Sequence, residues 1–345
     1  MNKDSKIYVA GHRGMVGSAI QRKLAQQGFT NIVTRTHKEL DLTRQNETES
    51  FFDKERPEYV FLAAAKVGGI HANSTYKADF IYQNITIAAN IVQASYKTGV
   101  KKLLNLGSTC IYPKLAPQPM KEEYLLTGAL EPTNDAYAIA KISAIKMCHF
   151  YNEQYGTNFM SVMPTNLYGP NDNYHFENSH VLPAFIRKIH LAKALMSNDF
   201  AEIIRDFQKH DKNAPVGNDE ILKKLKSLGI TKGNIALWGS GTPYREFLHA
   251  DELAEACVFI LSKYNAKDLG EFINLGTGKD YPLKEIAAMV KNVVGYEGSF
   301  SWDTTKPDGT PKRLSDVSRV NALGWTAKIS VPDGIGMVYQ EYLAI

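Results

Sequence analysis

The residues of this sequence best placed to do chemistry are a tyrosine and a lysine four positions apart, Tyr137 and Lys141. On a helix, positions i and i+4 share a face, so the phenol and the ammonium can point into one cleft. A cation beside a phenol stabilises the phenolate, and we expect it to lower the pKa of Tyr137. A tyrosine tuned in this way can exchange a proton with a carbonyl near neutral pH. The same spacing also occurs on solvated helix faces, so its meaning depends on the elements around it.

Those elements begin at the N-terminus of the sequence. Residues 6–10 indicate a short buried strand, and residues 18–28 have helical periodicity. Between them lie Gly11, Gly14 and Gly17, and strand, glycine turn and helix together are the opening unit of a dinucleotide-binding fold. The first glycine permits the turn, the second lets the backbone approach a pyrophosphate, and the third lets the helix pack on the strand. Free N–H groups at the helix N-terminus favour phosphate binding.

The end of the second expected strand indicates which dinucleotide is bound. An acidic residue there would favour NAD, because it hydrogen-bonds the ribose 2′-hydroxyl. This chain instead carries Arg35 and His37, with Arg13 in the first loop. Arginines can bind a 2′-phosphate bidentately, whereas histidine is largely neutral at pH 7, so we expect NADP to be held mainly by the two arginines. Asp41 and Leu42 are expected to contact the adenine.

Strand and helix patterns then alternate along the chain, which predicts an α/β fold with a doubly wound parallel sheet of Rossmann type. Further strands are expected at 31–36, 59–65, 102–107 and 159–164, and long helices at 80–98 and 137–155. Ligands bind such sheets at the carboxyl ends of the strands, where Ser108, Thr109 and Cys110 should lie. We expect residues 1–170 to form the cofactor domain, with a strand or helix returning near 235–265. Residues 171–345 should form a smaller α/β substrate domain.

Composition narrows the class of protein. The chain has 345 residues, of which 44% are hydrophobic and 22% charged, and its net charge of +4 is too small to argue for nucleic acid. No apolar run has transmembrane length, so no membrane partner is expected, and no signal peptide is expected before Gly11. The three cysteines lack the spacing of metal ligands, so no metal site is expected, and they fit a reducing cytoplasm.

The motifs resemble those of the extended short-chain dehydrogenase/reductases nearly from end to end. Within that family they are similar to epimerase-reductases that act on GDP-4-keto-6-deoxy-D-mannose. The segments that carry the resemblance are 11–17, 63–70, 107–113, 137–141, 164–170, 178–181, 238–247 and 306–311. The cysteine after Ser108 and Thr109, combined with Asn178-Ser179-His180, makes the resemblance narrow.

The resemblance implies a role for each reacting residue. Cys110 would remove the protons at C3 and C5 of the sugar, and His180 would supply protons on the opposite face. NADPH would reduce C4, while Tyr137 protonates the new oxygen, Ser108 hydrogen-bonds that oxygen and Lys141 holds the nicotinamide ribose. The residues expected to border the cofactor are Gly11, His12, Arg13, Gly14, Met15, Val16, Gly17, Arg35, His37, Asp41, Leu42, Ala63, Ala64, Leu106, Gly107, Ser108, Thr109, Lys141, Pro164, Thr165, Asn166, Leu167 and His180.

The resemblance also implies that the C-terminal part binds the GDP half of the substrate. The residues expected there are Lys188, Trp238, Arg245, Asp308 and Arg313. A purely structural reading has Trp238 capping the small domain and Lys188 solvated. His149, His190, Cys148 and Cys257 are interpreted as structural residues.

Two features of the sequence depart from the family pattern. His37 stands where an arginine is typical, and about 35 residues near 196–233 are interpreted as an insertion with a helical pattern at 221–228. The insertion could be a surface appendage, a lid or an interface.

Apolar residues on more than one face of helices 80–98 and 137–155 predict a homodimer.

Two other functions share parts of this pattern. A nucleotide-sugar epimerase or dehydratase that keeps NAD bound would have the tyrosine and lysine without needing Cys110 and His180. A binding protein that senses the cofactor would tend to lose the tyrosine or the lysine, and both are present.

Overall fold

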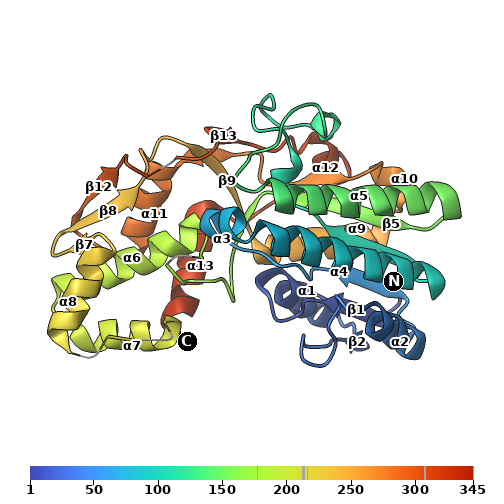
Figure 1. The fold of residues 1–345 in the computed structure, drawn as a ribbon, viewed down its shortest axis with the longest axis horizontal. Coiled ribbons are helices and arrows are strands. Elements are labelled where there is room, and N and C mark those ends of the chain that lie inside the picture. Colours follow the sequence, from blue (N-terminus) through green and yellow to red (C-terminus); the bar gives the residue numbers. More distant parts are fainter. Residues whose placement is uncertain (177, 212–213, 216, 307, 345) are drawn as a thin grey trace. The chain divides into compact units, whose positions relative to one another are not determined.

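The structure of the chain is a computed structural model that describes residues 1–176, 178–211, 214–215, 217–306 and 308–344 (Figure 1). Pro307 of the expected 306–311 motif and three residues of the expected insertion therefore lie outside the described residues, as does the side chain of Ile70. The chain divides into two compact units. The first unit comprises residues 1–171, 246–279 and 314–329, and the second comprises 172–245, 280–313 and 330–345.

A six-stranded parallel sheet forms the centre of the first unit, which confirms the expected fold class. Its order is β10-β5-β4-β3-β1-β2, and all pairings are parallel. The strands are β1 (Ile7–Ala10), β2 (Ile32–Val33), β3 (Tyr59–Leu62), β4 (Lys102–Leu106), β5 (Phe159–Pro164) and β10 (Ile273–Leu275). β1 is buried throughout and lies inside the sheet, as expected when helices cover both faces.

The two faces of this sheet have separate hydrophobic cores. Ile7 and Val9 of β1 belong to the core that also contains residues of α1 and α9, whereas Tyr8 and Ala10 belong to the core with residues of α2, α4 and α5. Successive side chains of a strand point to opposite faces, so one strand serves both cores. The helices of this unit are α1 (Met15–Gln26), α2 (Gln45–Glu55), α3 (Ile70–Thr75), α4 (Lys77–Lys97), α5 (Asp135–Tyr155), α9 (Ala250–Lys263), α10 (Ala266–Leu269) and α12 (Ser318–Ala322), with 3₁₀ turns η1 (Thr109–Ile111) and η2 (Glu122–Tyr124).

Two strands are shorter than the sequence pattern predicts. β3 ends at Leu62 instead of reaching residue 65, and β2 covers only Ile32 and Val33 instead of 31–36. β2 pairs with β1 alone, because it is the edge strand. The residues after β3 leave the sheet, and Ala64 then lies directly against the turn at Gly11.

The second unit has its own small sheet, of order β12-β8-β7. Its elements are β7 (Ile230–Thr231), β8 (Asn234–Trp238), β11 (Asp280–Pro282), β12 (Ser299–Asp303), β13 (Lys312–Arg313), α6 (Val181–Met196), α7 (Phe200–His210), α8 (Asn218–Ser227), α11 (Leu283–Val294) and α13 (Val331–Ala344). One further strand, β9 (Tyr244–His249), runs from this unit into the first. Its residues 247–249 pair with β6 (Asn166–Tyr168), and its residues 244–245 pair with β13.

The segment interpreted as an insertion is built into the second unit by a buried ion cluster. The side chain of Arg187 on α6 is fully buried, and its Nε donates to Asp206 of α7 at 2.8 Å. The same guanidinium bonds Asp211 and donates to the carbonyl oxygen of Tyr174 at 3.1 Å. α7 is therefore anchored to α6, and His190 bonds Glu202 of α7 as well, at 2.8 Å. Within the described residues, no helix has both the length and the apolar character needed to cross a membrane.

Candidate active site

Four of the expected reacting residues gather at the carboxyl end of β4. Ser108 directly precedes the turn η1, and its hydroxyl accepts a hydrogen bond from the backbone N–H of Cys110 at 3.4 Å. Tyr137 and Lys141 lie in the first two turns of α5, a helix that packs on η1 and β4. Because the carboxyl ends of the strands are the usual ligand-binding edge of such a sheet, this cluster is the candidate reaction centre.

Lys141 is fixed in position by the sheet. Its side chain is buried, and Nζ donates to the carbonyl oxygen of Leu106 at 2.8 Å. Nζ also lies 5.7 Å from the centroid of the Tyr137 ring. The phenol ring makes an edge contact with Phe80 of α4, and its hydroxyl has no hydrogen-bond partner among the described residues. The hydroxyl is thus open to a ligand.

The expectation that Lys141 lowers the pKa of Tyr137 is wrong. Burial raises the pKa of Tyr137, and a charge on Cys110 would raise it further. Burial likewise lowers the pKa of Lys141, to about 8. Loss of hydration penalises both charged forms, and at 5.7 Å from the ring the ammonium does not reverse this. The tyrosine is therefore held as a neutral phenol, the form that can donate a proton.

The three thiols occupy different surroundings. Cys110 is buried in the turn next to Ser108 and lies close enough to Tyr137 and Lys141 for its charge to affect the pKa of each. Cys148 and Cys257 are fully enclosed in the cores on the two sides of the sheet. Burial raises the pKa of Cys148 to about 12 and raises that of Cys257 as well, so both are packing residues.

The glycine turn has the shape that a dinucleotide requires. Gly11 has a φ of 81°, and a Cβ there would lie 2.8 Å from the backbone of Ala64. A Cβ on Gly17 would lie 2.1 Å from the carbonyl oxygen of Gly11, so the helix could not pack as it does with any side chain there. Gly14 caps α1 without a side-chain hydrogen bond, which leaves the first N–H groups of this helix for phosphates. The buried Nδ1 of His12 also has no hydrogen-bond partner within the described residues. These features fit a dinucleotide cofactor.

The three residues expected near the 2′-phosphate differ in how free they are. Arg35 donates to Glu55 at 2.6 Å and to its neighbouring Thr34 carbonyl at 2.7 Å. His37 is exposed, and its Nδ1 lies 3.8 Å from Asp41. Arg13 is exposed and makes no hydrogen bond or ion pair among the residues that the structure describes. Arg13 is therefore the more available cation.

The remaining expected cofactor residues lie on the same sheet edge or on neighbouring loops. Thr165 and Asn166, just after β5, both donate to the carbonyl oxygen of Glu246, at 3.3 and 2.9 Å. The Asp41 carboxylate is occupied by Thr43, whose hydroxyl donates to it at 2.7 Å. Expected residues at or just after the ends of strands are Ala63, Ala64, Leu106, Gly107 and Pro164; Leu167 is in the middle of β6, and Met15 and Val16 begin α1.

The expected substrate residues all belong to the second unit, as does His180, which directly precedes α6 and is exposed. Lys188 is buried, burial lowers its pKa to about 8, and it has no ion pair or hydrogen bond among the described residues. Its Nζ lies 5.8 Å from the ring centroid of Trp238, which is 61% exposed. Lys306 lies 5.3 Å from the same ring. Trp238 is thus an exposed aromatic surface near two cations and not a cap on the core.

Two arginines lie side by side on neighbouring strands. Arg245 of β9 pairs in register with Arg313 of β13. Burial and the charge of Arg313 together lower the pKa of Arg245 to about 10. Such a pair of cations favours an anionic ligand. Asp308, in contrast, is engaged with the turn after Trp238, since its carboxylate accepts from the backbone N–H and the hydroxyl of Ser240 at 2.7 and 2.8 Å.

Three residues near these sites were not expected from the sequence. Lys306 could have been found as the cation at the start of the 306–311 segment. Phe80 contacts Tyr137 from a distant helix, which no local pattern indicates. Glu246 follows Arg245 directly but looks like an ordinary strand residue in the sequence.

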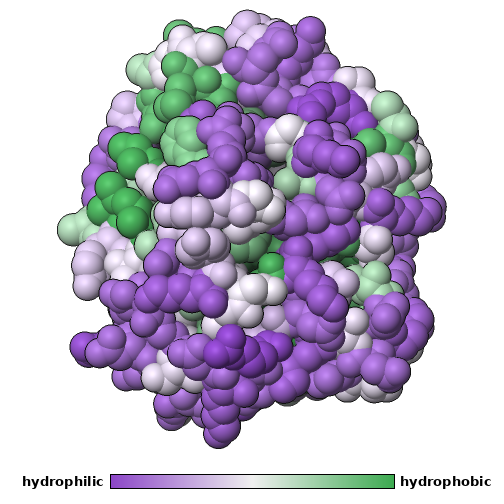
Figure 2. All heavy atoms as spheres, turned by 90° about the vertical axis from the view of Figure 1, so that its right-hand side faces the viewer, coloured by the Kyte–Doolittle hydropathy of each residue, from purple (hydrophilic) through white to green (hydrophobic). Residues whose placement is uncertain are grey.

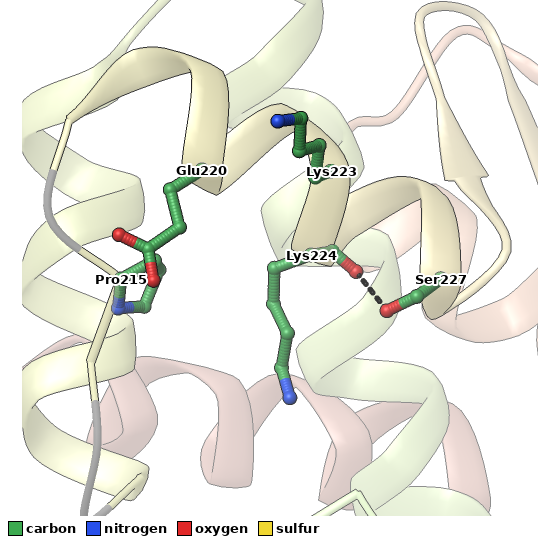
Figure 3. A pocket seen from close by; sticks show the side chains of 5 residues that line it. All are labelled: Pro215, Glu220, Lys223, Lys224 and Ser227. Carbon is green, nitrogen blue, oxygen red and sulfur yellow. Dashed lines mark hydrogen bonds between the residues drawn. The ribbon is translucent and has the colours of Figure 1, made fainter.

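A pocket on α8 lies outside these sites (Figure 3). Its lining residues are Pro215, Glu220, Lys223, Lys224 and Ser227. Glu220 is turned toward Pro215, and the two lysines point in different directions, so their charges do not converge on one ligand. None of the expected site residues lines it.

Residues 7–209 and 218–276 match the profile of the NAD dependent epimerase/dehydratase family. The chain belongs to this family, as its motifs predicted, and it is an oxidoreductase that uses a nicotinamide cofactor. It is 53% identical over 342 residues to GDP-L-fucose synthase 1 of Arabidopsis thaliana, covering 99% of this chain and 94% of that one. It is 48% identical over 344 residues to GDP-L-fucose synthase of Escherichia coli, covering 98% and 96%. A solved GDP-mannoheptose C4 reductase of Campylobacter jejuni with NADP bound superposes with a TM-score of 0.90, at 43% identity over 99% of each chain.

Proposed function

We propose that this chain converts GDP-4-keto-6-deoxy-D-mannose into GDP-L-fucose, by epimerisation at C3 and C5 and reduction at C4. The observation that carries the proposal is the cluster of Ser108, Cys110, Tyr137 and Lys141 at the carboxyl end of β4. A thiol beside a proton-donating phenol is the combination that both half-reactions need. The names of two relatives at 53% and 48% identity support it.

In the first half-reaction, Cys110 removes the protons at C3 and C5. These protons are acidic because the charge of the enolate spreads onto the C4 oxygen, and the Ser108 hydroxyl stabilises that charge. His180 donates protons from the opposite face. An inversion requires groups on both faces of the ring, and Cys110 and His180 come from segments far apart in the sequence.

In the second half-reaction, the cofactor supplies a hydride to C4. Tyr137 donates its proton to the oxygen formed there, as general acid. The neutral phenol found at this position suits that role. Lys141, held on the Leu106 carbonyl, carries the positive charge that keeps the ribose and the phenol in place.

NADPH is the proposed cofactor. Its phosphates would lie at Gly14 and the N-terminus of α1, and its 2′-phosphate on Arg13, with Arg35 contributing less because Glu55 already neutralises it. The relative solved with NADP supports this assignment.

GDP is proposed to bind on the second unit. The guanine base would lie against Trp238, near Lys188 and Lys306. The diphosphate would lie on Arg245 and Arg313, whose neighbouring charges an anion would neutralise. Asp308 would act indirectly by holding the turn at Ser240.

A homodimer through α4 and α5 is also proposed. These two helices pack against each other, and each exposes large hydrophobic side chains: Tyr82 and Tyr96 on α4, and Ile139 and Phe150 on α5. The face shown in Figure 2 carries hydrophobic side chains in patches among hydrophilic ones. Self-association would cover the exposed side chains of α4 and α5.

The direct test is to incubate the protein with NADPH and GDP-4-keto-6-deoxy-D-mannose, follow the loss of NADPH absorbance, and identify the product by NMR. GDP-L-fucose is expected. No NADPH oxidation, or a product reduced at C4 with C3 and C5 unchanged, would reject the proposal.

A further inference from the structure

Glu246 is a fully buried carboxylate that binds backbone groups from two distant segments. Its Oε1 accepts hydrogen bonds from the N–H groups of Thr277 and Gly278, at 2.7 and 2.8 Å. Its Oε2 accepts from the N–H of Ser315 at 2.9 Å. A Cβ on Gly276 would lie 2.2 Å from Oε1, so the carboxylate fills its site without spare room.

These bonds lie where the chain passes between its two compact units. The chain passes from the second unit to the first between Arg245 and Glu246, back after residue 279, and again to the first after Arg313. Glu246 therefore ties together three of the connecting segments within two residues of each passage. Its own carbonyl oxygen accepts from Thr165 and Asn166, which anchors the cluster to the end of β5.

Two of the connected segments carry the paired arginines. Arg245 directly precedes Glu246, and Arg313 lies two residues before Ser315. The arginines are in register on β9 and β13, and their like charges repel each other. A bidentate contact with a diphosphate depends on a fixed spacing of the guanidinium groups. The bond from Ser315 to Glu246 fixes the ends of the two strands against each other.

We propose that Glu246 is a positioning residue that holds Arg245 and Arg313 in register to bind the diphosphate of the nucleotide-sugar substrate. This inference rests on the proposed function, because it assigns the two arginines to the substrate. Glu246 itself touches no substrate in this role.

The test compares Glu246→Gln with Glu252→Gln. Glu246→Gln keeps the shape of the side chain but replaces one carboxylate oxygen with an NH₂ group. That group cannot accept the backbone N–H hydrogen bonds that the oxygen accepted. Glu252 is another buried carboxylate of the first unit, and it accepts from the backbone N–H of Lys328; neither residue lies on the strands of the arginines, β9 and β13. Binding of GDP and of NADPH is measured by calorimetry, and unfolding by thermal melting.

We expect GDP to bind Glu246→Gln roughly tenfold more weakly, as for the loss of about one good hydrogen bond. NADPH binding should stay within about twofold of wild type, and Glu252→Gln should bind GDP normally even if it melts earlier. In the background Arg245→Ala, Glu246→Gln should weaken GDP binding little further, because the two act through one contact.

Wild-type GDP affinity in Glu246→Gln would overturn the inference and leave the proposed function intact. Equal weakening of GDP and NADPH would overturn it too, because that result indicates general structural damage. If Glu246→Gln does not fold, Glu246→Asp, which is too short to reach both segments, is measured with the same criteria. Failure of wild type to bind GDP would instead reject the proposed function.

Discussion

Lys141 Nζ donates a hydrogen bond to the Leu106 carbonyl oxygen at 2.8 Å, which joins the second turn of α5 to the last residue of β4. The sheet thus fixes the position of the lysine. Its burial also makes its charge sensitive to pH in the neutral range, since its pKa is lowered to about 8. This combination leads to the first prediction.

The value of kcat/KM for NADPH should fall as the pH rises through about 8, because free enzyme then loses the Lys141 charge. Lys141→Arg keeps its charge at these pH values and should lose this fall, even if it is less active. The contribution of Lys141 to stability changes with pH in the opposite direction. Between about 8 and the ordinary value of 10.5, folded protein binds fewer protons at Lys141 than the unfolded chain, so the contribution of this group to stability rises with pH. An unchanged fall in Lys141→Arg would show that another group titrates.

Arg13→Ala should weaken NADPH binding by roughly 10- to 100-fold and leave NADH binding nearly unchanged, as expected for a lost charge-assisted contact with the 2′-phosphate. Arg35→Ala is the matched control and should have a smaller effect, because Arg35 is paired with Glu55. Dissociation constants for both cofactors measure this. Equal losses for NADPH and NADH in Arg13→Ala would rule out the assignment.

Arg187→Met should destabilise the protein by about 3–5 kcal/mol, because the buried Asp206 and the partly buried Asp211 would lose their cation. Arg205→Met removes a pair whose arginine is 69% exposed and should cost about 0.5 kcal/mol or less. Urea denaturation of both variants gives the comparison. Similar free energies of unfolding would mean that the buried cluster is not what anchors α7.

Phe150→Glu should convert the proposed dimer into monomers, because it places a charge at an exposed apolar position of α5. Leu222→Glu, at an exposed apolar position on α8, should leave the mass unchanged. Light scattering at micromolar concentration distinguishes the two. A wild-type mass of one chain would contradict the proposed assembly outright.

The sequence was sufficient to predict the features that are determined by neighbouring residues in the chain. Alternating strands and helices, and glycines at 11, 14 and 17, predicted the parallel sheet and the cofactor turn, because strand periodicity and the space required by a Cβ act within a few residues. The ends of β2 and β3 were missed, since they depend on which strand lies alongside.

Properties that depend on burial could not be predicted in the same way. The Tyr137–Lys141 spacing predicted a shared face, but the direction of the tyrosine pKa shift follows from desolvation by residues distant in sequence. The roles of Glu246 and Arg187 could not be predicted for the same reason. Each is a charged residue in an unremarkable sequence context, and its partners come from segments that only the fold brings together.

The most direct test of the proposed chemistry is the reaction carried out in deuterated water, with the product analysed by NMR beside NADPH consumption. The product should carry deuterium at C3 and C5. Cys110→Ala should slow the exchange of these protons with solvent deuterium but should still bind NADPH. In Tyr137→Phe the exchange should continue, whereas NADPH oxidation should be ~10²–10⁴-fold slower. A product that retains its original hydrogen at C3 and C5 would contradict the account.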